Sequence, residues 1–338
     1  MSKPKNTLKK IGIVILVIGI AWMICSFIPP KQAVSGVNPW RKTEQTLISA
    51  HRGGAILNPE NTKKAFDYVI VETGYTDIVE IDVRVTKDNK LVIIHDDSIN
   101  RTGIAGHDMY EEIPEEVVVF INERTYEELL QYNLGVNFTK DGAKPYANLS
   151  AEEAASEGLT IMLFDDFLRI YEKYDVKVLL EIKDKKELGV HAVDLAESII
   201  AKYPSWDERI MTISFSTDVV NHSLKTYPNR YVAGMGYNMV SFLAGSLLNI
   251  DCLFDIKYQS VQSSMITEAG PLKINCATQA FVDSAHARNQ CVAYWTINEE
   301  ADMRYLIGLG VDAITTNSPD LLATVLGKDL TQPRKTLK

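Results

Sequence analysis

The sequence predicts an α/β fold: a (β/α)8 barrel with an inserted segment at its rim, preceded by one N-terminal transmembrane helix. Strand-like segments alternate with helical stretches between residues 46 and 316. Acidic side chains recur near the ends of these strands, as they do at the rim of a parallel barrel. About 300 residues follow the apolar N-terminal segment, enough for one large barrel or two ordinary domains, and no linker is visible after residue 43.

The strand-like segments lie near residues 46–51, 78–85, 91–95, 177–182, 210–215, 230–235, 252–258, 291–297 and 312–316. This is one strand too many for an eight-stranded barrel. The connection VTKDNKLV after the second strand is too short for a crossover, so the second and third strands are expected to form an antiparallel hairpin. The hairpin would bring His95 back to the level of Glu80 and Asp82 and leave eight strands to close the barrel.

The strand at residues 78–85 carries polar side chains on one face. Glu80, Asp82 and Arg84 alternate with valine and isoleucine, so they share one side of the strand. A surface strand with a solvated polar face is the alternative interpretation. The pattern recurs in KVLLEIK, where Glu181 and Lys183 are in phase, and this repetition favours a barrel rim.

The segment IGIVILVIGIAWMICSFI, residues 11–28, is uncharged and long enough for a helix to cross about 30 Å of hydrocarbon. Because Lys31 alone follows closely, the lysines before the segment place the N-terminus in the cytoplasm and the barrel outside the cell; they are Lys3, Lys5, Lys9 and Lys10. A cleaved signal peptide is the alternative. The apolar segment is longer than a typical h-region, and the small-residue motif at residues 33–35 follows two prolines, so an uncleaved single-pass anchor in the cell membrane is expected.

The chain therefore divides into successive parts. They are a cytoplasmic N-terminus at 1–10, a transmembrane anchor at 11–30, a linker at 31–43, the barrel domain at 44–328 with an insertion at about 103–160, and a C-terminal tail at 329–338.

Composition limits the partners. The formal net charge of −9 argues against nucleic acid, and no basic run occurs beyond the flank of the anchor. Cys252, Cys276 and Cys291 have no metal-ligand spacing, and buried thiols are favoured over a disulfide. The sequence carries no indication of the oligomeric state.

Residues 46–97 contain two histidines, two arginines and a Glu-x-Asp pair. A lone histidine is usually structural, but His51 and His95 flank the carboxylate pair, and His51 is followed by Arg-Gly. Two imidazoles can divide the roles of acid and base, because an unperturbed pKa near 6.5 leaves either form accessible. These residues can bind a metal and move protons.

Several segments resemble the glycerophosphodiester phosphodiesterase family. The matching pieces are HRGG, PENT followed by AF, VEIDVRVTKDNKLVIIHDDSINRTG, LLEIK, VAYWTIN and DAITTNSPD, in the family's order from residue 46 to about residue 326. The resemblance implies a TIM barrel, one divalent cation, and hydrolysis of a phosphodiester that links glycerol to an alcohol.

By the same resemblance, His51 and His95 are the acid/base pair, and Arg52 and Lys183 bind the phosphate. These residue types suit the chemistry, because the site must neutralise the phosphate, orient a nucleophile and protonate the leaving alkoxide. Arginine offers a fork of donors to two phosphate oxygens, and lysine offers a compact charge.

Glu80, Asp82 and Glu181 match the family's metal-binding carboxylates. An all-oxygen set suits Ca²⁺ or Mg²⁺, and the ligand types do not distinguish the two. The alternative is a salt-bridge cluster of these carboxylates with the nearby arginines and lysine. Three carboxylates that converge without a cation would repel one another, which favours the metal site.

Two further residues are candidates for the substrate pocket. Glu60, in PENT, is expected near the glycerol or the metal, while Asn61 suits a helix N-cap. Trp295, in AYWTIN, lies at a strand end and can pack against the glycerol end of the substrate or belong to the core. The chain departs from the family pattern after residue 103, where LTIMLFDDFL lacks the usual proline and the preceding loop is longer and acidic. This insertion is expected to select the alcohol, and His107 within it is expected on the surface.

The expected function is hydrolysis of glycerophosphodiesters to glycerol 3-phosphate and an alcohol outside the membrane. The substrate would be a deacylated phospholipid, a lysophospholipid or a glycerol-phosphate polymer. A phospholipase D-like or lysophospholipid phosphodiesterase with the same barrel and metal site is the alternative enzyme. A non-catalytic binding module is the alternative from another class.

Overall fold

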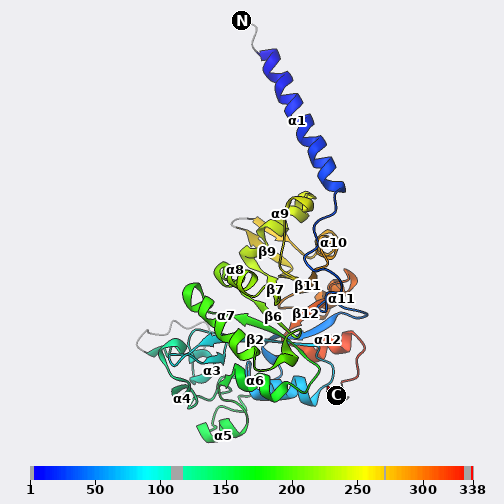
Figure 1. The fold of residues 1–338 in the computed structure, drawn as a ribbon. Helices are drawn as coiled ribbons and strands as arrows, with labels where there is room; N and C mark the ends of the chain where they lie inside the picture. The colour runs from blue at the N-terminus through cyan, green and yellow to red at the C-terminus, as the bar shows by residue number, and fades with distance from the viewer. Residues whose placement is uncertain (1–3, 108–116, 270–271, 331–335, 338) are drawn as a thin grey trace.

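The computed structural model describes residues 4–107, 117–269, 272–330 and 336–337. A long helix, α1 (Pro4–Phe27), projects from a barrel domain that holds the rest of the described chain (Figure 1). Its residues Lys9–Phe27 are long and apolar enough to cross a membrane. Lys3 and the acidic stretch at 111–116 lie outside the described residues.

The barrel has the predicted architecture. Within the described residues, eight parallel strands close through the pairing of β1 with β2. They are β1 (Leu47–Ala50), β2 (Ile78–Val85), β5 (Lys177–Ile182), β6 (Ile210–Ile213), β7 (Tyr231–Gly234), β8 (Ser260–Ser263), β11 (Cys291–Tyr294) and β12 (Ala313–Thr316).

The predicted hairpin is also confirmed. The strand β3 (Leu91–Ile93) pairs antiparallel with the end of β2, and the short β4 (Met162–Leu163) pairs with β3. The backbone N–H of Ile94 donates to the carbonyl of Asp82 at 2.9 Å. His95 is thereby held beside the polar face of β2.

The strand prediction at 252–258 was wrong. That segment begins in the 3₁₀ helix η7 (Asp251–Leu253), and the barrel strand is β8, whose buried sequence SVQS is largely polar. The apolar residues of the segment before β8 led to the wrong strand assignment, because Ile256 and Tyr258 are buried against the outer helices and do not belong to a barrel strand. A second antiparallel hairpin, of β9 (Ile266–Ala269) and β10 (Leu272–Asn275), was not anticipated.

Helices cover the outside of the barrel (Figure 1). They are α2 (Lys63–Phe66), continued as a π-helix over Asp67–Glu72, α6 (Phe164–Tyr171), α7 (Lys186–Ile200), α8 (Thr217–Thr226), α9 (Val240–Leu248), α10 (Gln279–Ala287), α11 (Glu300–Gly308) and α12 (Pro319–Val325). One apolar cluster packs α2, α6 and α7 against β2 and β5, and a second packs α9 to α12 against β8, β11 and β12.

The segment predicted as an insertion packs over β3 and β4. The short helix α3 (Asn100–Gly103) leads into it, and it contains the short helices α4 (Tyr126–Leu129) and α5 (Ala151–Ser156). Capping boxes define the starts of α4 and α5, because Thr125 and Ser150 each exchange hydrogen bonds with a glutamate three residues later. An apolar cluster that includes Ile99, Ile121 and Leu134 attaches the segment to β3.

The segment expected to be a linker at 31–43 closes the amino-terminal end of the barrel. Trp40 is 1% exposed and packs among the first interior residues of the strands, with its ring centroid 6.2 Å from that of Tyr231. Asn38 is buried and donates hydrogen bonds to the carbonyls of Gln259 and Asn289. The second half of this segment is therefore the floor of the barrel.

Replacing Trp40 with alanine should destabilise the barrel by about 3 kcal/mol or more, because the change leaves a cavity that the strands cannot fill. Thermal unfolding of the detergent-solubilised chain would show this as a fall of several degrees in Tm. The control is Val37→Ala at a site that is 90% exposed, which should leave Tm unchanged. Equal Tm values for the two variants would contradict the role of Trp40.

Candidate active site

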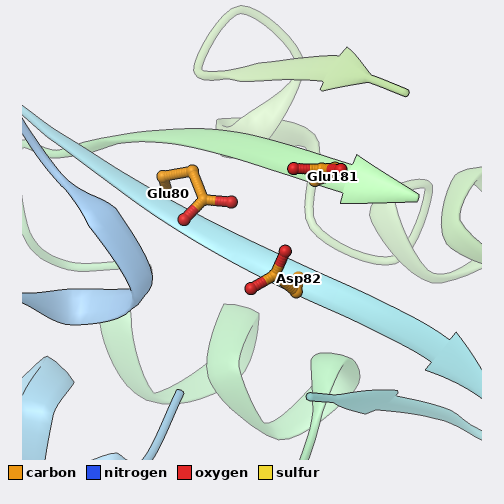
Figure 2. A group of neighbouring side chains, drawn as sticks. All are labelled: Glu80, Asp82 and Glu181. Carbon is orange, nitrogen blue, oxygen red and sulfur yellow. The ribbon is translucent and has the colours of Figure 1, made fainter. Parts of the chain in front are cut away.

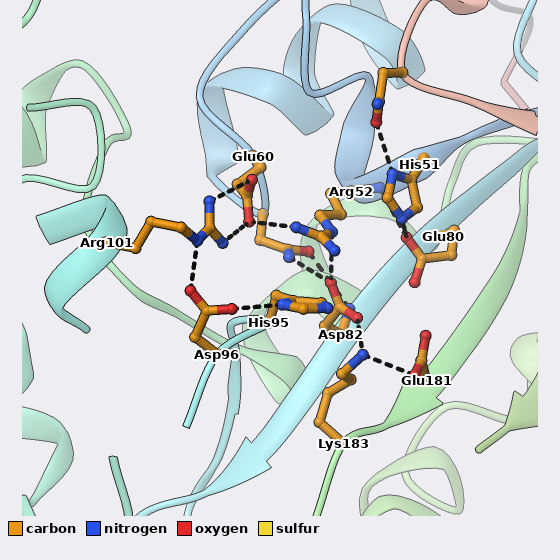
Figure 3. A network of polar contacts seen from close by, with 12 residues as sticks. His51, Arg52, Glu60, Glu80, Asp82, His95, Asp96, Arg101, Glu181 and Lys183 are labelled. Carbon is orange, nitrogen blue, oxygen red and sulfur yellow. Dashed lines mark hydrogen bonds and ion pairs between the residues drawn. The ribbon is translucent and has the colours of Figure 1, made fainter. Parts of the chain in front are cut away.

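The predicted functional residues converge at the carboxyl ends of the barrel strands (Figure 3). His51 directly follows β1, and Lys183 directly follows β5. Glu80 and Asp82 lie on β2, and the hairpin brings His95 to the same place. This end of a (β/α)8 barrel is where active sites occur.

Glu80, Asp82 and Glu181 form a buried carboxylate cluster. Asp82 and Glu181 lie opposite each other in the parallel pairing of β2 and β5. Glu80 lies two residues before Asp82, so its side chain is on the same face of β2. One oxygen from each carboxylate lies within 4.8 Å of the other two. Figure 2 shows the three side chains turned toward a common space above the two strands.

Burial and mutual repulsion govern the charges of this cluster. Burial, Asp82 and Glu181 raise the pKa of Glu80 well above its ordinary value. Burial and Asp82 also raise the pKa of Glu181. Burial alone would raise the pKa of Asp82, but the charges of Arg52 and Lys183 outweigh that effect and hold this pKa below its ordinary value. Asp82 therefore stays ionised at the centre of the cluster.

The cluster fits a divalent cation. Among the described residues, Oε1 of Glu80 and Oδ1 of Asp82 are buried and accept no hydrogen bond, although Nζ of Lys183 lies 3.5 Å from the Asp82 oxygen. Such orphan oxygens are costly in an interior, and a cation would satisfy them. Across the wider site five carboxylates face three cationic side chains, which leaves a formal excess of two negative charges.

Arg52 joins the carboxylates through a left-handed backbone conformation (φ 52°, ψ 31°), which is uncommon outside glycine. Its backbone N–H donates to Oε2 of Glu80 at 2.8 Å. Its guanidinium donates to Glu60 at 3.0 Å and has Nε 3.4 Å from Oδ2 of Asp82. The next residue, Gly53, has φ 79°, and a Cβ there would lie 3.0 Å from the ring of Phe66, so this turn requires glycine.

Lys183 neutralises the other side of the cluster. Its Nζ donates to Oε1 of Glu181 at 2.8 Å and lies 3.5 Å from Oδ1 of Asp82. Arg52 and Lys183 therefore approach Asp82 from opposite sides, and Figure 3 shows both side chains directed at its carboxylate.

Both histidines are held through Nδ1. Nδ1 of His51 lies 2.6 Å from Oδ1 of Asn317, which accepts its proton. Nδ1 of His95 lies 2.6 Å from Oδ1 of Asp96. The Nε2 atoms are left for other partners, and that of His51 lies 4.0 Å from Oε2 of Glu80. Burial and the charge of Arg52 lower the pKa of His51 to about 4, so its imidazole is neutral at neutral pH.

Sequence reasoning missed four residues that hold this site together: Asn61, Asp96, Arg101 and Asn317. Asn61 was expected to cap a helix, but Thr62 is the N-cap of α2. Asn61 instead has φ 56° and donates from Nδ2 to Asp82 at 2.8 Å. Their positions in the sequence could have identified them, because each lies within one of the segments that match the family.

Arg101 and Glu60 form an outer layer. Arg101 donates to both oxygens of Glu60, at 2.6 and 3.0 Å, and to Oδ2 of Asp96 at 2.5 Å. Although burial opposes it, this pairing lowers the pKa of Glu60. Glu60 thus binds the two arginines and lies outside the carboxylate cluster.

Trp295 directly follows β11 and lies at the same end of the barrel. Its ring makes an edge contact with Phe215, at a centroid distance of 5.6 Å. Its Nε1 is buried and has no hydrogen-bond acceptor among the described residues. Trp295 also packs against the interior apolar cluster of the barrel, so its position is compatible with both expected roles, core packing and contact with a substrate that enters this end.

A cavity of about 530 Å³ opens beside the outer layer. Glu60 and Arg101 form its inner wall, and the inserted segment contributes Phe138, Lys144 and His107. His107 lies at the surface, as expected, but is only partly exposed, and its Nδ1 lies 3.1 Å from the amide nitrogen of Asn100.

Comparisons with known proteins agree with the geometry. The model of the glycerophosphoryl diester phosphodiesterase family matches residues 51–321. A glycerophosphodiester phosphodiesterase from Caldanaerobacter subterraneus is 27% identical over 288 residues, which cover 84% of this chain and 99% of that protein.

Solved structures show the same fold. A glycerophosphodiester phosphodiesterase from Agrobacterium tumefaciens aligns with a TM-score of 0.58 and 17% identity, covering 83% of this chain and 100% of the other. A phosphodiesterase from Oleispira antarctica, solved in complex with the product sn-glycerol-3-phosphate, aligns with a TM-score of 0.59 and 18% identity, covering 84% and 98%.

The carboxylate cluster predicts measurable cation binding. Isothermal titration calorimetry of the chain with Ca²⁺ or Mg²⁺ should show one binding site. Glu80→Gln or Asp82→Asn should lower the affinity for the cation by at least about tenfold, because loss of even an outer-shell partner of a metal ligand has an effect of about that size. Glu152→Gln, at an exposed position on α5, is the control and should bind normally. Unchanged affinity in both cluster variants would leave the cluster as an ion-pair network alone.

Proposed function

The chain belongs to the glycerophosphoryl diester phosphodiesterase family, and we propose from this premise how its residues hydrolyse a glycerophosphodiester to glycerol 3-phosphate and an alcohol. The observation that carries the proposal is the way both histidines are held. Asn317 and Asp96 bind the Nδ1 atoms of His51 and His95, which leaves the two Nε2 atoms available for proton transfer near Arg52 and Lys183. This is a suitable arrangement for acid and base catalysis on an anionic substrate.

Arg52 and Lys183 are the proposed phosphate ligands. Both side chains are mostly buried, and both now pair with carboxylates of the cluster. A phosphodiester entering between them would replace carboxylate contacts with contacts to its own oxygens. The guanidinium of Arg52 can bind two phosphate oxygens at once. The ammonium of Lys183 can stabilise the negative charge that develops on the phosphate oxygens in the transition state.

His51 and His95 are proposed to divide the proton transfers. The depressed pKa of His51 keeps its Nε2 unprotonated, as a proton acceptor requires. Asp96 orients His95, and its own pKa is lowered by its hydrogen bonds with His95 and Arg101 despite burial, so it remains a carboxylate. An ionised partner stabilises the positive charge that an imidazole carries after it takes up a proton and before it delivers one.

Glu80, Asp82 and Glu181 are proposed to hold one Ca²⁺ or Mg²⁺ ion, which would supply positive charge to the phosphate. The fit rests on the orphan oxygens of Glu80 and Asp82 and on the formal excess of carboxylates over cationic side chains at the site. Asn61 keeps Asp82 oriented by a hydrogen bond that does not depend on the cation.

The inserted segment is proposed to select the alcohol. Its cavity shares Glu60 and Arg101 with the catalytic site, so a leaving group bound at the phosphate can extend into it. Phe138 offers an apolar surface there, and Lys144 and His107 offer polar contacts. Deacylated phospholipids, lysophospholipids and glycerol-phosphate polymers remain the candidate substrate classes.

We also propose that α1 is an uncleaved anchor that spans the cell membrane once, with its N-terminus in the cytoplasm. Its apolar segment Lys9–Phe27 is of sufficient length, and none of it is buried in the barrel. The lysines before the segment support this orientation. The barrel and its site would then act outside the cell.

Replacing His51 or His95 with alanine should lower turnover of glycerophosphocholine by roughly 10²-fold or more, the usual contribution of a positioned acid or base. Release of glycerol 3-phosphate measures this directly. His191→Ala is a matched control, because that histidine lies on α7 and contacts Asn89. Near-normal turnover in one catalytic variant would assign that histidine a structural role.

Replacing Phe138 with alanine should change the preference among alcohols. The ratio of kcat/KM values for glycerophosphocholine and a lysophospholipid should shift by roughly 10-fold, the scale of a changed apolar contact. Turnover of bis(p-nitrophenyl) phosphate should persist. Phe120→Ala removes an aromatic ring from the same insertion, outside this cavity, and should leave the ratio unchanged. The same shift in both variants would argue against a specific pocket.

A further inference from the structure

A group of large apolar side chains is exposed on one side of the barrel, on and beside α9. We call this surface the α9 face. Each member is at least 57% exposed. They are Tyr237, Val240, Leu247, Leu248, Leu253 and Ile266. Apolar patches of this kind on a domain surface usually mark a contact with a membrane or a protein.

Four of the six members of the α9 face lie in an uncharged stretch of sequence. No Asp, Glu, Lys, Arg or His occurs between Arg230 and Asp251, a stretch that contains β7 and all of α9. Helices that face water normally carry charged residues on their outer side, as α7 does with Lys186, Glu187 and Asp194. The outer side of α9 therefore lacks the composition of a solvated helix.

The α9 face lies against the end of α1. Nε1 of Trp22 donates a hydrogen bond to the carbonyl oxygen of Leu248 at 2.7 Å. Sγ of Cys252 lies 3.3 Å from the carbonyl oxygen of Cys25, and Lys31 forms an ion pair with Asp255 at 3.0 Å. In Figure 1, α9 is the labelled barrel helix nearest to the end of α1.

These contacts set the depth of the end of the α9 face that carries Leu248. Trp22 lies five residues before Phe27, the last residue of the apolar span. At about 1.5 Å per residue, Leu248 is level with a point about 7 Å inside that end of the span. Surfaces that bind the membrane interface commonly enter it by about 5–10 Å. The contact also places the Trp22 ring near the end of the span, where tryptophan is enriched.

We infer that the α9 face is immersed in the outer leaflet of the bilayer that α1 spans. The inference rests on the proposed anchor, and its occupant is lipid because the partner of Leu248 is itself a residue of the membrane span. The barrel is thus held against the membrane by its side, and burial of the apolar side chains in lipid favours this position.

The α9 face also reaches the catalytic end of the barrel. Tyr237 and Val240 follow the carboxyl end of β7, and Ile266 follows that of β8. Gly236 lies beside Phe215, which contacts Trp295 in the mouth of the site. An amphiphilic phosphodiester such as a lysophospholipid could therefore present its headgroup at the mouth from the membrane side.

The test measures the depth of single positions in the full-length chain. The chain is reconstituted into phosphatidylcholine and phosphatidylglycerol vesicles that contain nitroxide-labelled acyl chains. A thiol-reactive fluorophore is placed at Leu247→Cys or Leu253→Cys in a background with Cys25→Ser and Cys252→Ser, since Cys276 and Cys291 are buried. Turnover of soluble glycerophosphocholine verifies that each labelled chain is folded.

Both labels should show blue-shifted emission and several-fold stronger nitroxide quenching than a label at Glu152→Cys on α5, which lies at the far end of the barrel from α1 (Figure 1). Quenching no greater than that of the α5 label, in chains that resist carbonate extraction from the vesicles, would overturn the inference and leave the anchor intact. Chains removed by carbonate would overturn the anchor and the inference together.

A second variant pair tests the apolar contact itself. Leu247→Asp combined with Leu248→Asp should reduce quenching of the label at Leu253→Cys several-fold, because charged side chains are costly below the membrane surface. Leu330→Asp removes another exposed leucine and should have no effect. Equal quenching in the two cases would show that apolar burial of α9 does not hold the barrel to the membrane, and would overturn the inference.

Discussion

Electrostatic repulsion among buried carboxylates is the constraint that shapes the catalytic end of this barrel. The pairing of β2 with β5 places Asp82 directly beside Glu181, and Glu80 projects from the same face of β2. Three such groups cannot all be ionised in a dry interior without compensation. Arg52 and Lys183 supply part of it, and the cluster is left with orphan oxygens that a divalent cation would satisfy.

The unusual backbone at the site follows from the same constraint. Arg52 adopts a left-handed conformation in which its N–H reaches Glu80 while its side chain reaches toward Asp82. Asn61 adopts a similar conformation, donates its own N–H to the carbonyl of Arg52 and donates its amide to Asp82. The two left-handed residues are thus hydrogen-bonded to each other, and each also donates a hydrogen bond to a carboxylate of the cluster. Such conformations persist only where the surroundings determine them, and they concentrate at functional sites.

The barrel separates this charged centre from an uncharged side. The carboxylates lie inside the carboxyl ends of the strands, whereas α9 presents an apolar outer surface beside α1. The two regions meet at the rim, through Phe215 and Trp295. A phosphodiesterase arranged in this way would combine polar chemistry at the mouth with access to amphiphilic substrates, because headgroup and acyl chain would each remain in a favourable environment.

Local patterns in the chain were sufficient for the barrel and for the hairpin that carries His95, because strand periodicity is a local property. The grouping of His51, Glu80, Asp82 and Glu181 followed from the order of the motifs along the chain and from their resemblance to a known family. The polar strand β8 was missed, since its burial comes from neighbouring strands and not from its own composition. Asn61, Asp96, Arg101 and Asn317 were also missed as partners, because a hydrogen bond between residues as distant as His51 and Asn317 depends on the closure of the barrel. Contact between Trp22 and Leu248 likewise depends on how the folded barrel packs against α1.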